Sequence, residues 1–207
     1  GSFAYRIASW GWNQYQRLTT LTSDVEKSFR PAEDVISQFD SEIEGRDNWF
    51  GWLHFMEPHH PYDPDGGELS RAEAQRLTRK VLAWGGNESD RERVRDLYRR
   101  EVVELDEKLT TLWSSVPDDT RVVFCADHGE LLGEDGLWGH PGEMRPELLH
   151  VPFGTKNVPE LGDVVSLIDV PSILLDSEHG LGEWNRDVAF ATYGDKKAAM
   201  NTDNIAT

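Results

Sequence analysis

The chain of 207 residues contains a single cysteine, Cys125, so an intrachain disulfide is excluded. A lone cysteine fits a reducing compartment, and no signal peptide is visible in these residues, which together favour a cytoplasmic location. Apolar residues make up only 38% of the chain. No apolar run approaches the roughly 20 residues that a membrane-spanning helix needs. The sequence therefore predicts a protein that neither crosses a membrane nor depends on disulfides.

Lysine is also scarce. Only six of the 21 basic residues are lysines, against 38 acidic residues, and the net charge is −17. Such a surface repels the phosphates of nucleic acids and the head groups of anionic membranes, which argues against either as a partner. An acid-rich, lysine-poor composition is typical of proteins from salt-loving organisms, where salt screens the self-repulsion. We expect a protein of halophilic, archaeon-like character.

The chain lacks an initiator methionine and begins Gly1-Ser2, which predicts a processed protein or an excerpt of a longer one. Its length suits one domain over residues 1–207, with no convincing linker. A loop and a short helix are expected within residues 1–30.

Apolar spacing predicts three helices, at 31–44, at 70–84 and in a long segment capped by Ser89 and Glu92. The predicted buried stripe of the long helix is Val94, Leu97, Tyr98, Val102, Leu105, Leu109 and Leu112. Strands are expected at 49–56, 120–126, 151–153 and 187–192, with a further helical segment at 166–175. Alternating strands and helices predict an α/β fold with a largely parallel sheet flanked by helices.

The stretch VVFCADHGE, residues 122–130, carries the strongest chemical signal. A buried strand brings a carboxylate, Asp127, and an imidazole, His128, to its C-terminal end, where open α/β sheets bind ligands. Neighbouring oxygen and nitrogen donors suit a divalent metal ion. A polar turn after a core strand is the alternative.

Residues 122–152, VVFCADHGELLGEDGLWGHPGEMRPELLHVP, resemble the sulfatases of the alkaline phosphatase superfamily. In that family a strand ends in Asp-His-Gly or Asp-Asn-Gly, followed by a glycine-rich stretch, a His or Lys, and an Arg/His-Val-Pro. Residues 52–64, WLHFMEPHHPYDP, are similar to the family's strand and P-H-x-P-Y loop. Residues 165–176, VSLIDVPSILLD, are similar to its SLxDLxPTLLD segment. Three motifs in the family's order imply its fold.

The family's nucleophile motif, Cys/Ser-x-Pro-Ser-Arg, is absent from the sequence, as is its pair of adjacent aspartates after the first strand. Cys125 lacks that context, and Asp118-Asp119 reads as a turn before a strand. The resemblance therefore implies the C-terminal portion of an incomplete α/β domain, with the formylglycine nucleophile in a missing N-terminal part.

The resemblance also implies roles for four residues. Asp127 and His128 match the family's metal ligands, and the ion is Ca²⁺, Mn²⁺, Mg²⁺ or Zn²⁺. Two ligands are too few for a tight site, so we expect weak or absent binding by this chain alone. His59 matches the histidine that hydrogen-bonds the sulfate group. His140 matches the His or Lys facing the ester oxygen, where it would protonate the leaving alcohol.

Other residues near these motifs carry weaker expectations. Tyr62 is expected to pack in the core, and Arg145 either binds an anion or pairs with a neighbouring glutamate. Glycines recur every third residue, which predicts a tight loop near the site, at Gly133, Gly136, Gly139 and Gly142.

The predicted function is a metal-dependent hydrolase of sulfate esters of small molecules or carbohydrates, inactive as this fragment. Two alternatives stay open. One is a metal-dependent phosphodiesterase or phosphotransferase of the same superfamily, which would use Thr or Ser as nucleophile. The other is a degenerate, non-catalytic binding module. An exposed sheet edge would also favour self-association.

Overall fold

The computed structural model describes residues 29–175, 186–203 and 205–206. The chain divides into two compact units, Gly1–Ser115 and Val116–Thr207, and each is described by itself. The prediction of one domain stays a prediction. The loop and short helix expected within residues 1–30 lie outside the described residues, apart from residues 29 and 30.

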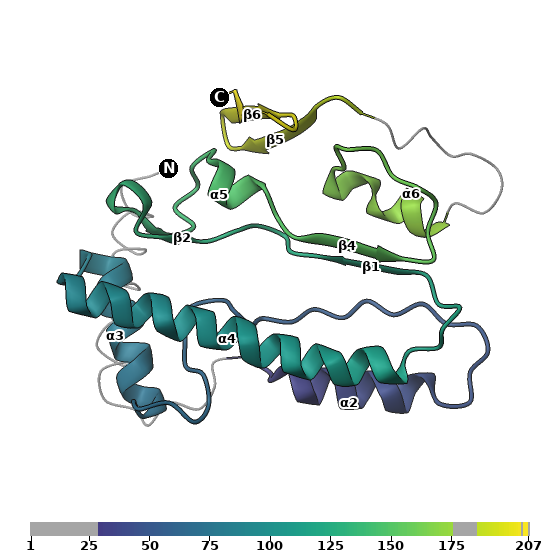
Figure 1. The fold of residues 1–207 in the computed structure, drawn as a ribbon, viewed down its shortest axis with the longest axis horizontal. Coiled ribbons are helices and arrows are strands. Elements are labelled where there is room, and N and C mark those ends of the chain that lie inside the picture. The colour runs from purple at the N-terminus through teal and green to yellow at the C-terminus, as the bar shows by residue number, and fades with distance from the viewer. Residues whose placement is uncertain (1–28, 176–185, 204, 207) are drawn as a thin grey trace, which may run out of the picture. The chain divides into compact units, whose positions relative to one another are not determined.

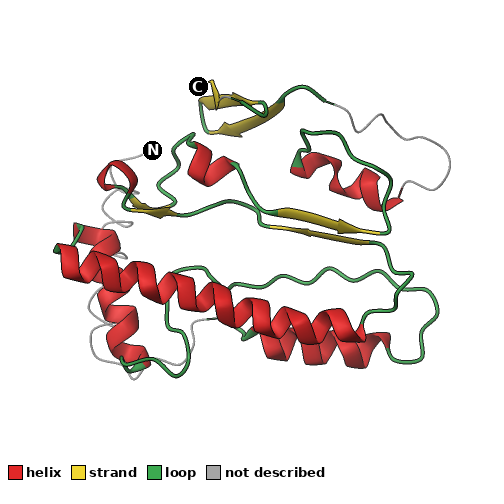
Figure 2. Ribbon diagram, viewed as in Figure 1, coloured by secondary structure: helices red, strands yellow, loops and turns green. Residues whose placement is uncertain are grey.

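From residue 29 onward, the first unit contains the helices α2 (Ala32–Ile43), α3 (Arg71–Trp84) and α4 (Glu88–Ser115) (Figures 1 and 2). The sequence predicted all three. Helix α2 lies along the C-terminal half of α4, where Lys108 pairs with Glu33 at 2.8 Å and the Ser115 hydroxyl donates to Asp40 at 2.8 Å. Ser70 caps α3, and Gly85 ends it in the left-handed conformation.

The cap of α4 lies two residues before the predicted one. The Asp90 backbone N–H donates to the Asn87 side chain at 2.9 Å, and the Asn87 N–H donates to the Asp90 carboxylate at 3.2 Å. Asn87 and Asp90 therefore form the reciprocal cap that the sequence assigned to Ser89 and Glu92. That prediction was wrong because both pairs have the same spacing, and sequence spacing alone does not show where the helix starts.

Replacing Asn87 with Ala is expected to lower the free energy of unfolding by about 1 kcal/mol, because α4 loses its N-terminal acceptor. Urea unfolding of the purified protein measures the change. Ser89→Ala, two residues away on an exposed position, is the control and should stay within about 0.5 kcal/mol of the parent. Equal effects of the two substitutions would contradict the assignment of the cap.

The buried face of α4 differs from the predicted stripe at one turn. Val94, Leu97, Leu109 and Leu112 are buried as predicted, but Val102 is 42% exposed. Glu101 is buried instead, at 4% exposure, because its carboxylate accepts the backbone N–H of Asp63 at 2.7 Å. A hydrogen-bonded carboxylate can occupy a core position that its charge would otherwise exclude.

Residues 49–56 form no regular secondary structure and pair with no strand among the described residues, so the strand predicted there is not observed. Burial alternates along the segment, with Phe50 and Trp52 exposed at 74% and 73%. The dense apolar run therefore has the period of a strand without a hydrogen-bonded partner in this structure.

The described residues of the second unit form three small sheets and short helices (Figures 1 and 2). Its strands are β1 (Val122–Cys125), β2 (Leu131–Leu132), β3 (Trp138–Gly139), β4 (Phe153–Lys156), β5 (Ala189–Tyr193), β6 (Lys196–Met200) and β7 (Ile205–Ala206). Its helices are α5 (Pro146–Leu149), α6 (Val170–Leu175) and the 3-10 turns η1 (Glu134–Gly136) and η2 (Leu167–Asp169). Helix α6 packs against β1. The predicted helical segment at 166–175 is observed as η2 and α6.

The strand pairs of the described residues, β1–β4, β2–β3, β5–β6 and β6–β7, are all antiparallel. The mixture of helices and small sheets fits an α/β domain, but the largely parallel sheet is not confirmed. Alternation of strands and helices along the chain does not specify which strands become neighbours, and here β1 pairs with the later strand β4.

Among the helices of the described residues, none combines the length and the apolar character that crossing a bilayer would require.

Candidate active site

Asp127 and His128 lie just after the C-terminal end of strand β1, as predicted. The Ala126 backbone N–H still donates to Pro152 at 3.4 Å, and the chain turns directly afterwards. Side chains are largely open to solvent there, with Asp127 74% and His128 40% exposed. Charged groups at such a strand end are available to a ligand, whereas the strand itself is held by its pairing with β4.

The Asp127 and His128 side chains are arranged so that one ion can contact both. The His128 Nε2 lies 3.9 Å from the Asp127 Oδ2. Two donors each about 2.1 Å from the same ion lie at most about 4.2 Å apart, so this spacing is compatible with shared coordination. The His128 Nδ1 lies 2.8 Å from the Gly129 carbonyl oxygen, which accepts its proton and leaves the Nε2 lone pair for a metal.

His140 lies beside this pair. Its ring centroid is 4.5 Å from that of His128, with the two planes tilted by 40°. The His140 Nδ1 lies 3.1 Å from the Glu130 carboxylate, whose side chain is only 7% exposed. The structure therefore brings together Asp127, His128 and His140, three of the four predicted site residues, and adds Glu130.

Gly129 connects the ligand pair to Glu130 at a place where only hydrogen fits. Its N–H donates to the Leu148 carbonyl at 2.9 Å, and a Cβ built on Gly129 would lie 1.9 Å from the Glu147 carbonyl oxygen. The turn at Gly129 therefore packs directly against the backbone of α5. The four regularly spaced glycines all have positive φ, as a tight loop requires: Gly133, Gly136, Gly139 and Gly142.

Gly129→Ala is expected to lower the free energy of unfolding by about 2 kcal/mol or more, because the backbone of α5 must move to admit the methyl group. In the full-length protein it should also weaken Mn²⁺ binding by displacing Asp127 and His128. Gly154→Ala is the matched control, since a Cβ there meets no atom within 4 Å. Urea unfolding and Mn²⁺ titration measure the two effects, and equal behaviour of the two variants would contradict the steric argument.

Cys125 lies two residues before Asp127, on the half-buried end of β1. Burial, and secondarily the Asp127 carboxylate, raises the pKa of the Cys125 thiol. A thiol with a raised pKa stays protonated at neutral pH and is a poor nucleophile. This agrees with the interpretation that Cys125 is not the reacting residue.

Arg145 is engaged by carboxylates. Its guanidinium lies 2.7 Å from Asp135 and 3.4 Å from Glu147, so the predicted pairing with Glu147 is observed. The hydrogen bond to Asp135, then that to Glu147, raises the Arg145 pKa. The pKa of Glu147 is lowered, first by a hydrogen bond from its own backbone N–H and then by the hydrogen bond from Arg145. An anion would have to compete with both carboxylates for Arg145.

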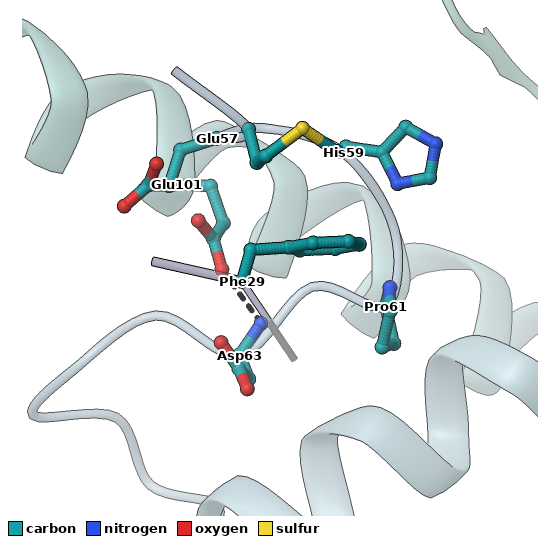
Figure 3. A pocket seen from close by; sticks show the side chains of 7 residues that line it. Phe29, Glu57, His59, Pro61, Asp63 and Glu101 are labelled. Atoms are coloured by element: carbon teal, nitrogen blue, oxygen red, sulfur yellow. Dashed lines mark hydrogen bonds between the residues drawn. The ribbon is translucent and has the colours of Figure 1, made fainter. Parts of the chain in front are cut away.

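His59 lies in the first unit, on the wall of a small pocket with a volume of about 20 Å³ (Figure 3). Phe29, Met56, Glu57, Pro61, Asp63 and Glu101 also line it. The His59 Nδ1 is 2.6 Å from the His60 carbonyl oxygen, and Phe29 packs edge-on to the ring at 5.4 Å. The role of His59 toward sulfate stays a prediction.

The loop that carries His59 is anchored by buried groups. Tyr62 is fully buried and packs edge-on to Tyr98 at 5.3 Å, which confirms the prediction that Tyr62 packs in the core. Next to it, the Asp63 backbone N–H donates to Glu101, and Gln75 donates to the Asp63 carboxylate. Helices α3 and α4 thus both fix the loop.

The sequence reasoning missed Glu130 and Glu101. Glu101 carries no local signal, since its acceptor role depends on a loop 38 residues away. Glu130 had a signal in principle. It precedes β2 and His140 follows β3, so a hairpin at the glycine-rich loop would place them opposite each other.

A model of the family described as "Sulfatase" matches residues 7–153. Curated relatives include "Low-salt glycan biosynthesis sulfotransferase Agl7" of Haloferax volcanii, 40% identical over 84 residues, 36% of this chain and 20% of that protein. "Choline-sulfatase" of Rhizobium meliloti is 27% identical over 126 residues, 48% of this chain and 25% of that protein. No solved structure matches.

Proposed function

Because the chain belongs to the sulfatase family, we propose that it supplies metal ligands and a proton donor to a metal-dependent hydrolase of sulfate esters. The chain covers only a fifth and a quarter of the two curated relatives, so the activity proposed is that of the full-length protein. Small molecules or carbohydrates bearing a sulfate ester are the proposed substrates. No nucleic acid or membrane takes part.

The observation that carries this proposal is the clustering of Asp127, His128 and His140 at the end of β1. Asp127 and His128 would hold the ion, since the Asp127 Oδ2 and the His128 Nε2 lie 3.9 Å apart. A bound divalent ion would polarise the sulfate oxygens and offset the charge that develops on them. The mixed oxygen and nitrogen donors favour Mn²⁺, Zn²⁺ or Mg²⁺ over Ca²⁺, which prefers oxygen cages.

In this proposal His140 protonates the oxygen of the leaving alcohol, and His59 hydrogen-bonds a sulfate oxygen. Both side chains are imidazoles, whose ring N–H groups donate hydrogen bonds and can supply a proton. The nucleophile and the remaining metal ligands are expected upstream of this chain.

Turnover by the full-length protein tests the proposal. We expect metal-dependent hydrolysis of 4-nitrophenyl sulfate, loss of activity in EDTA and recovery on adding Mn²⁺, and no turnover by the 207-residue chain alone. Hydrolysis of bis(4-nitrophenyl) phosphate in preference to the sulfate ester would favour the phosphodiesterase alternative. Inactivity on both esters, with metal bound, would favour the alternative that the protein is a non-catalytic binding module.

A second candidate is transfer of the sulfo group to an acceptor hydroxyl instead of water. It is favoured by the 40% identity to a relative that carries the name sulfotransferase. Incubating the full-length protein with 4-nitrophenyl sulfate and a sugar alcohol distinguishes the two. A sulfated sugar indicates transfer, and nitrophenol with free sulfate alone indicates hydrolysis.

A high-salt environment is part of the proposal. The net charge of −17 and a relative from Haloferax volcanii, a halophile, support it. Cytoplasmic location and self-association stay predictions.

A further inference from the structure

The hairpin β2–β3 places Glu130 directly opposite His140. Leu131 pairs with Gly139, and Leu132 pairs with Trp138. One step further along the same antiparallel register, Glu130 faces His140, and cross-strand neighbours at such positions are within side-chain reach. The hairpin therefore determines the contact between the two side chains.

The contact is short and partly screened from solvent. The Glu130 Oε1 lies 3.1 Å from the His140 Nδ1, and the Glu130 and His140 side chains are 7% and 33% exposed. The β2 residue beside Glu130, Leu131, is fully buried, and Trp138 on β3 is 9% exposed. Because the Glu130 carboxylate has so little exposure, water competes weakly for its hydrogen bond.

An ionised carboxylate only accepts hydrogen bonds, so the nitrogen that faces it must carry a hydrogen. The neutral His140 ring then has its proton on Nδ1 and its lone pair on Nε2. We propose that Glu130 is a positioning residue that holds His140 in the Nδ1–H tautomer, so that Nε2 is the nitrogen that exchanges a proton with the substrate.

The catalytic consequence rests on the proposed function. When the S–O bond breaks, its electron pair stays on the leaving oxygen, which takes the proton from Nε2, while the sulfo group passes to the nucleophile. His140 is left neutral, with its remaining proton on Nδ1 and directed at Glu130. A ring in the other tautomer would present Nδ1 to the carboxylate without a proton, and the contact would be lost.

The tautomer can be measured on the purified protein without any activity. Long-range ¹H–¹⁵N correlation spectra at a pH where His140 is neutral should show the Nδ1–H form, with the resonance assigned by its loss in His140→Gln. In Glu130→Leu the Nε2–H form should rise. Glu134→Gln is the matched control, because Glu134 lies in the same hairpin and accepts the Leu132 N–H at 2.6 Å. An Nε2–H tautomer in the parent, or an unchanged tautomer in a folded Glu130→Leu, would overturn the proposal.

Kinetics of the full-length protein give the second readout. Glu130→Leu should lower kcat for phenyl sulfate by about 10- to 100-fold, as is typical when a supporting partner of a functional histidine is removed. The loss should be smaller for 4-nitrophenyl sulfate, whose leaving group needs little protonation, and KM should be unchanged. Glu130→Gln, which keeps an acceptor oxygen, should recover part of the activity.

The two readouts separate the two hypotheses. Equal losses of kcat on both esters in an active enzyme would overturn the positioning role, because a purely structural defect lowers kcat by the same factor whatever the leaving group. An enzyme that hydrolyses no sulfate ester would overturn the proposed function, and the tautomer spectra would then decide on Glu130 alone.

Discussion

Replacing Asp127 with Ala in the full-length protein is expected to lower kcat/KM for a sulfate ester by about 100- to 1,000-fold. This corresponds to the several kcal/mol of transition-state stabilisation that a correctly held metal ion supplies. Asp127 is one of two donors 3.9 Å apart, so its loss leaves His128 as the single donor of the pair. Parallel titrations with Mn²⁺ should show weaker binding by the variant.

Asp118→Ala is the matched control for this experiment. Asp118 precedes the same strand, its side chain is fully exposed, and it makes one ion pair, with Lys156 at 3.4 Å. Exposed pairs of this kind contribute about 0 to 1 kcal/mol, so activity and metal affinity should stay near those of the parent. If Asp127→Ala retained both, Asp127 would not be a metal ligand.

Replacing Tyr62 with Ala should have the largest effect on stability. Tyr62 is fully buried and its ring packs edge-on to Tyr98 at 5.3 Å. Truncating a buried aromatic ring removes its apolar burial and leaves a cavity, so the free energy of unfolding should fall by about 3 to 5 kcal/mol. Urea unfolding followed by far-UV circular dichroism measures the change.

Two controls accompany this prediction. Tyr62→Phe keeps the ring and should retain most of the stability. Phe50→Ala removes an aromatic side chain that is 74% exposed in the same unit, and should change stability by less than about 0.5 kcal/mol. A loss in Tyr62→Ala no larger than that in Phe50→Ala would contradict the assignment of Tyr62 to the core.

Helices were predictable where their signals are local. The predicted limits 70–84 agree with α3, which Ser70 caps and Gly85 ends, since capping depends on residues within one turn of the helix end. The four glycines with positive φ were also recognisable, because only glycine adopts that conformation at little cost. At α4 the same kind of reasoning placed the N-terminal cap two residues too far along the chain, because Asn87–Asp90 and Ser89–Glu92 have equal spacing.

The strand neighbours of residues 49–56 and of β1 were not predictable from the sequence. The run at residues 49–56 has the apolar character of a strand, yet it has no ladder partner among the described residues. Strand β1 pairs antiparallel with β4. Hydrogen bonds between β1 and β4 join residues that are distant along the chain. Neither composition nor periodicity specifies which strands pair.

By itself, the sequence determined the family, the helices α2, α3 and α4, and the place of Asp127 and His128 at a strand end. Each helix, each family motif and the strand end depends on residues close together in the chain. Only the tertiary structure decided that His140 packs on His128, that Glu130 faces His140, and that Glu101 is buried against Asp63. Such contacts join residues from different segments, and a buried carboxylate is stable only where folding supplies a donor for it.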